Sequence, residues 1–229
     1  MNVHKPTYHC FFEQSGTFKN EFKKLGFKSF DYDILNEYGE TDYVVDLYGE
    51  IDKAYLGLKS IFDKIYSDQD MIIAFFPCTL FEQQILLHFK GQAIQFAKYE
   101  DIKKLKLDLK LQEDLNRNYT AITKLAIVCL ERKIPLIIEN PYSEHHYLKR
   151  YWCLEPSIID TNRRNRGDNY VKATQFFFIN CKPKYNKIYE KVKKQEKKSV
   201  TKSKKYERSD INPIYANRFI KEFIIDYEE

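Results

Sequence analysis

Short apolar runs of strand length alternate along this chain with longer segments whose apolar residues recur at helical spacing. Residues 71–76 form a fully apolar run, and residues 135–138 form another. A strand that is covered on both faces of a parallel sheet has this continuous apolar pattern. Strands that alternate with helices indicate βαβ units. The sequence therefore predicts an α/β fold with a doubly wound, mostly parallel sheet.

The predicted elements follow from the period of the apolar residues. We predict strands at residues 8–12, 27–33, 43–47, 71–76, 135–138 and 174–179. We predict helices at residues 18–25, 51–65, 81–87 and 101–131, and a short final helix after Pro213. In the long helix, the stripe formed by Leu115, Ile122, Leu125 and Cys129 is expected to face the core.

Length and composition bound the domain organisation. The chain has 229 residues, of which 43% are hydrophobic, enough for one sizeable core. We expect one α/β domain at residues 1–181, a lysine-rich segment at 182–205, and a C-terminal helix within 206–229 that packs on the core. No apolar run approaches the roughly 20 residues of a membrane span, and the N-terminus lacks the pattern of a signal peptide. A cytoplasmic protein without membrane association is expected.

The charge is uneven, since the formal net charge of +5 is concentrated in the basic C-terminal segment at residues 182–205. Such a segment can neutralise nucleic-acid phosphates, or it can be a solvated helix face or linker. The five cysteines are scattered and form no C-x-x-C pair, so we expect reduced thiols. His145 and His146 have no partner at ligand spacing, and no metal site is expected.

Polar and reactive residues follow several of the predicted strands. In an open sheet of this kind, the ligand binds outside the carboxyl ends of the strands. Residues placed to face such a crevice are Glu13, Ser15, Gly16, Asp33, Asp46, Pro77, Cys78, Glu139 and Asn140.

The stretch from Cys10 to Asp33 resembles the cofactor-binding opening of DNA cytosine-5 methyltransferases and their phage and prophage relatives. The resemblance implies a Rossmann-like methyltransferase fold that binds S-adenosylmethionine, with Gly16 in the loop beside the methionine part and Asp33 on the ribose hydroxyls. Gln14 stands where the family usually has its first loop glycine. The cofactor-binding residues implied in this way are Phe12, Glu13, Ser15, Gly16, Thr17, Asp33, Asp46 and Pro77.

A second stretch, Phe76-Pro77-Cys78, is similar to the Pro-Pro-Cys loop of that family, with Phe76 in place of the first proline. The resemblance implies that the Cys78 thiolate attacks carbon 6 of a flipped-out cytosine, which makes carbon 5 nucleophilic. Backbone N–H groups at a strand end are expected to lower the pKa of such a thiol. The alternative is that Cys78 is a small buried hydrophobic residue.

The third stretch, Glu139-Asn140-Pro141, looks like the Glu-Asn loop of the family, with Pro141 where valine is usual. The resemblance implies that Glu139 holds the base and helps to protonate it as the cysteine adds. The alternative is that Glu139 only caps a helix. Residues that the resemblance places near the substrate are Asn140, Arg163, Arg164, Arg166 and Lys172.

The resulting hypothesis is a methyltransferase that acts on cytosine in DNA through Cys78 and Glu139. The larger enzymes of the family carry a separate target-recognition domain, and no comparable segment fits within this length. Target recognition would then be weak, absent or delegated to a protein partner. Two alternatives stay open: a non-catalytic protein that binds nucleic acid or protein with the same fold, and a methyltransferase acting on another base or nucleotide.

Overall fold

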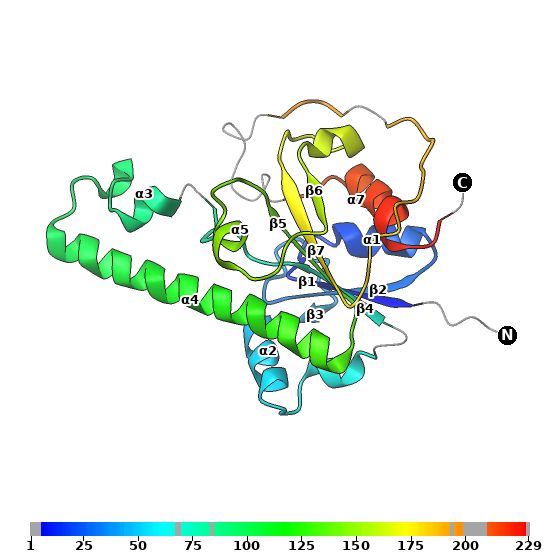
Figure 1. The fold of residues 1–229 in the computed structure, drawn as a ribbon, viewed down its shortest axis with the longest axis horizontal. Coiled ribbons are helices and arrows are strands. Elements are labelled where there is room, and N and C mark those ends of the chain that lie inside the picture. The colour runs from blue at the N-terminus through cyan, green and yellow to red at the C-terminus, as the bar shows by residue number, and fades with distance from the viewer. Residues whose placement is uncertain (1–5, 67–69, 83–84, 193–194, 199–209, 228–229) are drawn as a thin grey trace.

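The computed structural model describes residues 6–66, 70–82, 85–192, 195–198 and 210–227, and in them a central sheet lies between two groups of helices (Figure 1). The strands are β1 (Thr7–Phe11), β2 (Lys28–Asp33), β3 (Tyr43–Val44), β4 (Asp70–Phe75), β5 (Leu136–Pro141), β6 (Ile158–Asp160) and β7 (Thr174–Ile179). They are arranged in the order β3-β2-β1-β4-β5-β7-β6. The α/β class and the mostly parallel sheet are confirmed.

The sheet is parallel except at one strand. Strand β1 pairs in parallel with β2 and β4, and β4 pairs in parallel with β5. Strand β7 runs antiparallel between β5 and β6. Between β1 and β4 the direction of strand succession reverses, which is the point where an open α/β sheet leaves a crevice at its carboxyl edge.

Each face of the sheet is covered by a different set of helices. Helices α2 (Leu47–Tyr55) and α4 (Asp101–Arg132) cover one face, where Ile72 packs with Leu125 in a buried cluster. Helices α1 (Thr17–Lys24) and α7 (Pro213–Phe219), with the turn η5 (Ile220–Ile224), cover the other. There Ile73 packs with Phe18 and Phe219. Neighbouring side chains of a strand point to opposite faces, so Ile72 and Ile73 supply both cores.

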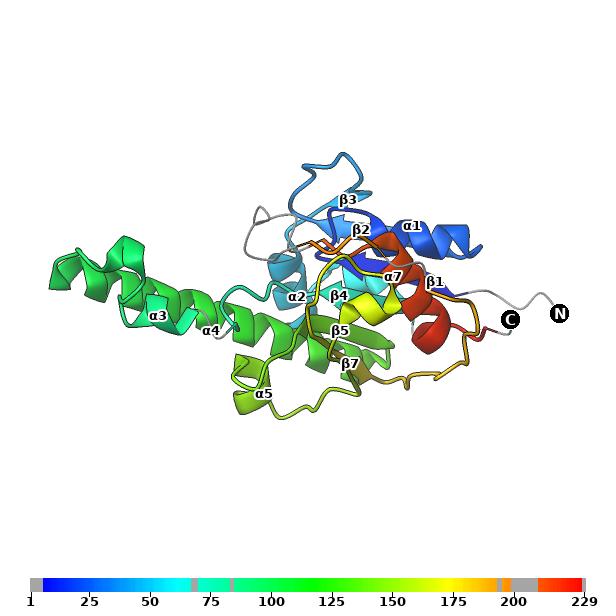
Figure 2. The same cartoon turned by 90° about the horizontal axis from the view of Figure 1, so that it is seen from above.

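Helix α4 is much longer than the sheet is wide. Its 32 residues span about 48 Å at 1.5 Å per residue. Its buried residues begin at Leu115, and the turns before this residue project from the domain together with α3 (Leu86–Phe89) and the short helix η3 (Ile94–Phe96) (Figure 2). The predicted core stripe from Leu115 to Cys129 is confirmed.

Several predicted boundaries differ from the structure, and local capping explains one of them. The helix expected at 51–65 begins earlier as α2, because the Asp46 carboxylate accepts a hydrogen bond from the Tyr48 N–H at 3.1 Å. It ends at Tyr55 before Gly57, whose φ of +70° is typical of a residue beyond a helix C-terminus. The turn η1 (Ile61–Lys64) follows separately. The helix expected at 81–87 was placed too early, and α3 begins at Leu86.

The C-terminal region packs along α7 and η5. Lys184 N–H donates to the Phe223 carbonyl at 3.0 Å, and Asn186 N–H donates to the Glu222 carbonyl at 2.8 Å. Of the lysine-rich segment at 182–205, residues 193–194 and 199–205 lie outside the described residues. None of the helices that the structure describes is both long and apolar enough to cross a lipid bilayer.

Candidate functional site

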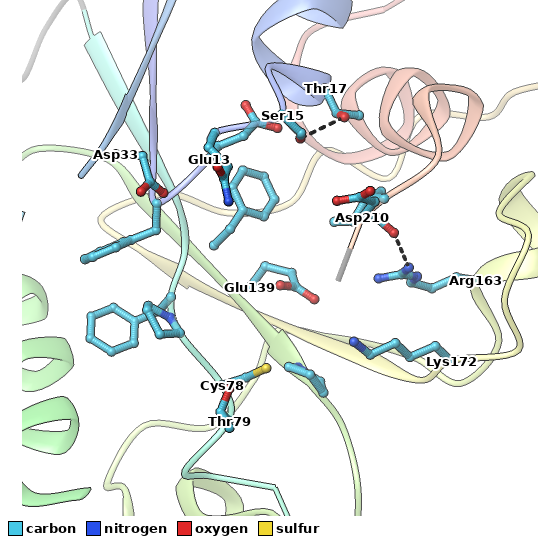
Figure 3. A pocket seen from close by; sticks show the side chains of 17 residues that line it. Glu13, Ser15, Thr17, Asp33, Cys78, Thr79, Glu139, Arg163, Lys172 and Asp210 are labelled. Carbon is cyan, nitrogen blue, oxygen red and sulfur yellow. Dashed lines mark hydrogen bonds between the residues drawn. The ribbon is translucent and has the colours of Figure 1, made fainter. Parts of the chain in front are cut away.

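A cavity of about 220 Å³ opens at the carboxyl edge of the sheet, where the segments after β1, β2, β4 and β5 meet (Figure 3). Its lining includes six of the residues predicted to bind the cofactor: Phe12, Glu13, Ser15, Thr17, Asp33 and Pro77. It also includes both predicted catalytic residues and two predicted substrate contacts: Cys78, Glu139, Arg163 and Lys172. The folded chain therefore brings together residues that are as far apart in sequence as Phe12 and Lys172.

The loop after β1 makes a sharp turn at Phe12, whose φ of 58° lies in the left-handed region. This conformation is strained for a large side chain. Gly16 also has a positive φ, 66°, and a Cβ there would lie 3.1 Å from the Asn20 side chain. Gln14 is not among the described residues with positive φ, so its replacement of a glycine strains nothing.

Glu13 is buried beneath this loop and caps helix α1. Its carboxylate accepts hydrogen bonds from the Phe18 N–H at 2.7 Å and the Lys19 N–H at 3.2 Å. Burial raises the pKa of Glu13 to about 7, although both hydrogen bonds act in the opposite direction. The helix terminus that binds phosphate in dinucleotide-binding proteins is thus already occupied by an acidic side chain.

Asp33 ends strand β2 and faces the same cavity. Its carboxylate accepts a hydrogen bond from the Leu35 N–H at 2.8 Å. Burial raises the pKa of Asp33, and the backbone N–H groups of Leu35 and Ile34 partly offset this rise. Asp46, predicted beside it as a cofactor ligand, is instead the N-cap of α2 and lies outside the cavity lining.

The segment after β2 is held by a buried ion pair. Lys19 Nζ on α1 lies 3.0 Å from Asp31 Oδ2 on β2 and 3.5 Å from Asp42 Oδ2. Both Lys19 and Asp31 are almost fully buried. Because removing a buried charge from its partner is costly, this pair fixes α1 to the end of β2.

Cys78 lies at the carboxyl end of β4, after Pro77, with its thiol at the cavity (Figure 3). The thiol donates to Glu82 Oε1, with sulfur and oxygen 3.4 Å apart. Burial raises the pKa of Cys78 to about 12; the Glu82 charge adds to this rise and Lys172 opposes it. The expected lowering of the pKa is therefore wrong: the site favours a protonated thiol.

Glu139 stands at the end of β5, beside β4. In the parallel register it is paired with Phe75, three residues before Cys78. The Thr174 hydroxyl on β7 donates to the Glu139 carboxyl group and also lies 3.0 Å from the Asn140 carbonyl oxygen. One hydroxyl has one hydrogen, so Thr174 donates to one of these two oxygens at a time.

Asn140 is fully buried and lies outside the cavity lining. Its side-chain amide donates to the Phe76 carbonyl oxygen at 3.0 Å. This contact joins the end of β5 to the segment that leads into Cys78. Within the described structure, Asn140 therefore braces the Cys78 segment and does not face the cavity.

The three predicted arginines are separated by the fold. Arg163 lines the cavity, although its guanidinium is paired with Asp168 at 2.7 Å. Arg166 pairs with Asp160 and Glu222, each at 2.9 Å. Arg164 donates to backbone carbonyl groups outside the cavity lining, and neither Arg164 nor Arg166 faces the cavity. Gly16, by its position behind Ser15, shapes the loop without joining the lining.

The sequence analysis gave no role to Glu82 and Thr174, the hydrogen-bond partners of the two predicted catalytic residues, or to Phe75, Thr79, Asp210 and Ile211 of the cavity lining. Glu82 is placed beside Cys78 by a turn, and Thr174 is placed beside Glu139 by the pairing of β5 with β7. The four-residue spacing of Cys78 and Glu82 is a signal that could have identified the first pair. The second depends on a long-range strand pairing that the sequence does not reveal.

No protein-family model matches the chain, and no curated protein matches it significantly. Among the residues that the structure describes, no three His, Cys, Asp or Glu side chains are grouped to hold a metal ion. The cavity lining combines the Cys78 thiol with the Glu139 and Lys172 side chains, and Glu82 contacts the same thiol.

Proposed function

We propose that this chain is an S-adenosylmethionine-dependent methyltransferase that acts on carbon 5 of cytosine in DNA, with Cys78 as nucleophile and Glu139 as acid. The observation that carries the proposal is that Cys78 and Glu139, at the ends of neighbouring parallel strands, open into one cavity. The loop after β1, which the resemblance assigns to the cofactor, opens into the same cavity.

The strand order differs from that of a dinucleotide-binding sheet. A dinucleotide-binding sheet has the parallel order 3-2-1-4-5-6. Here an antiparallel β7 is inserted between β5 and β6. Together with the capped terminus of α1, this insertion argues against a dinucleotide-dependent enzyme, and the remaining support for a methyltransferase is the resemblance of the loop after β1.

The charges around the cavity fit a cationic cofactor. Glu13, Asp33 and Glu139 line it, and burial raises the pKa of Glu13 and of Asp33. S-Adenosylmethionine, when bound, supplies a methyl group from a positively charged sulfur. In our proposal Asp33 holds the ribose hydroxyls, and Glu13 with the loop through Ser15 and Thr17 borders the methionine part.

The remaining residues act on the substrate. The Cys78 sulfur adds to carbon 6 of cytosine, and negative charge then develops in the ring. Glu139, oriented by Thr174, donates a proton to the ring as this charge develops. In our proposal Lys172, which lines the cavity, contacts a DNA phosphate, whereas Arg163 is buried and paired with Asp168 and shapes the wall. In our proposal a protein partner supplies the target recognition.

One observation favours the non-catalytic alternative. The Cys78 thiol has a pKa raised to about 12, so a ready-made thiolate is absent at neutral pH. A protein that kept the fold and binds nucleic acid or a protein partner would not need one. A methyltransferase acting on another base would share the cofactor pocket but would not need Cys78.

The test combines cofactor binding with covalent trapping. Calorimetry is expected to show S-adenosylmethionine binding to the wild type and to Cys78→Ser alike. Duplex DNA containing 5-fluorocytosine should trap the wild type covalently and leave Cys78→Ser free, because fluorine at carbon 5 cannot leave as a proton does. Binding without methyl transfer to any DNA would contradict the proposed reaction, and an absence of binding would favour the non-catalytic alternative.

A further inference from the structure

The turn after Cys78 is built so that Glu82 returns to the thiol. The Phe81 N–H donates to the Cys78 carbonyl oxygen at 2.8 Å and closes the turn. The Phe81 ring is almost fully buried, stacking with Phe76 at 6.4 Å and with Tyr147 at 6.0 Å between ring centroids. The Phe81 carbonyl also accepts the Tyr147 N–H at 2.8 Å. With Phe81 fixed in this way, the carboxylate of Glu82 lies 3.4 Å from the Cys78 sulfur.

We propose that Glu82 is the base that takes the thiol proton of Cys78 while the sulfur bonds to the pyrimidine ring. This inference rests on the proposed function and names a residue that the resemblance does not assign. It resolves the conflict between a protonated thiol and a reaction that needs a sulfur nucleophile. The proton leaves only as the carbon–sulfur bond forms, so no thiolate has to exist beforehand.

The other polar groups around the cavity are less suited to this step. Glu139 is bonded to Thr174 and is needed as an acid, so it has to begin the reaction with a proton. Glu13 is occupied by two N–H groups of α1. A lysine ammonium has no lone pair to accept a proton, which excludes Lys172.

The proton and electron balance of the step closes within the site. The S–H bond breaks and its proton moves to Glu82, while the sulfur electron pair forms the bond to carbon 6. The ring electrons of the carbon 5–carbon 6 double bond move toward carbon 5 and the ring nitrogen, which takes a proton from Glu139. After carbon 5 has received the methyl group and lost its hydrogen to water, the carbon–sulfur bond breaks. Glu82 then returns its proton to the sulfur and Glu139 recovers its own.

Substitution Glu82→Gln separates this role from a structural one. A glutamine oxygen can still accept the thiol hydrogen bond, but it cannot take up the proton. Removing the negative charge lowers the pKa of Cys78, so alkylation of this thiol by iodoacetamide should become severalfold faster at pH 8. Methyl transfer to mixed-sequence duplex DNA in a single turnover should instead fall by about 10²-fold, the lower range for general base catalysis.

The pH profile supplies a second readout. In Glu82→Gln, methyl transfer should rise with pH as the thiolate fraction rises, while the wild type should be flat above neutral pH. The exposed Cys153, resolved by peptide mass spectrometry, is an internal control for alkylation. Glu113→Gln, at an exposed position of α4, is the matched control for removing one carboxylate.

Three results would overturn the inference. The first is unchanged methyl transfer in Glu82→Gln, and the second is a parallel fall of alkylation and transfer, which would mean that Glu82 only supports the turn. The third is a wild type that transfers no methyl group to DNA. That result alone would also reject the proposed function, so the two failures are distinguishable.

Discussion

Thr174 and Glu139 lie on neighbouring antiparallel strands, and the Thr174 hydroxyl donates a hydrogen bond to the Glu139 carboxyl group. The carboxyl group is thereby held by β7, a strand far from it in sequence. An acid that must protonate a base in one orientation benefits from such a fixed position. The first prediction follows from this contact.

Thr174→Val should lower methyl transfer by roughly tenfold and the free energy of unfolding by about 1–2 kcal/mol, because the buried Glu139 carboxyl group loses its hydrogen-bond donor. Single-turnover transfer and urea unfolding measure the two effects. Thr123→Val is the control. Thr123 lies on α4, away from the cavity, and its hydroxyl accepts a hydrogen bond from the Trp152 indole N–H. Equal transfer rates in the two variants would contradict the role of Thr174.

The second prediction concerns Gly16 and uses Gly57 as its match. Both have positive φ, 66° and 70°, but a Cβ on Gly16 would meet neighbouring side chains, whereas a Cβ on Gly57 would meet nothing within 4 Å. Alanine at either position should destabilise the fold by about 1 kcal/mol. Only Gly16→Ala should also weaken S-adenosylmethionine binding in calorimetry. Equal affinities for S-adenosylmethionine in the two variants would show that the loop around Gly16 does not contribute to cofactor binding.

The third prediction concerns the pH dependence that Glu13 confers. Burial raises its pKa from 4.5 in the reference state to about 7 in the folded protein. The folded state therefore holds more protons than the unfolded state between these values, and this group makes the protein less stable as the pH rises from 4.5 to 7. The loss at neutral pH amounts to about 3 kcal/mol at 1.36 kcal/mol per pKa unit.

Urea unfolding of the wild type and of Glu13→Gln at a series of pH values isolates this contribution. The stability of the wild type relative to the variant should decrease between pH 4.5 and 7 and level off above it. Saturating S-adenosylmethionine should reduce the decrease, because its positive charge favours ionised Glu13. A difference that is constant with pH would show that folding does not raise the pKa of Glu13.

The fourth prediction is that Lys19→Met destabilises the fold by about 3–5 kcal/mol, because Asp31 is left charged and buried without its partner. Lys23→Met, on an exposed turn of the same helix, should cost less than about 1 kcal/mol. The double variant Lys19→Met with Asp31→Asn should recover part of the loss in urea unfolding. If the losses in the free energy of unfolding from the two single substitutions simply add up in the double variant, Lys19 and Asp31 do not stabilise each other.

The regular part of the fold could be predicted because local pattern and burial agree there. The run at 71–76 is apolar throughout, and the predicted bounds differ from those of β4 (Asp70–Phe75) by one residue at each end. Strand β6 was missed, since its three residues carry no pattern of their own and are ordered by pairing with β7. The antiparallel direction of β7 was equally invisible, because it depends on the path of the chain between distant segments.

The candidate site was predictable where position along a strand decides it. Asp33, Cys78 and Glu139 follow strand ends, and parallel strands bring such ends to one edge. Asp46 was misplaced because its carboxylate is used by the nearest helix terminus. Arg166 was misplaced because a cluster of acidic side chains within the fold pairs with it. Contacts of this kind require knowledge of the partner, which no single segment contains.

Helix α4 is continuous, but its two halves have different surroundings. The half that begins at Leu115 packs against the sheet, whereas Ile102, Leu105 and Leu109 in the other half are exposed to solvent. Amide hydrogens should therefore exchange with deuterium along a gradient, fastest near Asp101 and slowest near Cys129. A partner that binds the turns before Leu115 would slow amide exchange near Asp101 and make the exchange rates along α4 more alike. Because α4 is a single continuous helix, the same element would then join that binding surface to the core of the domain.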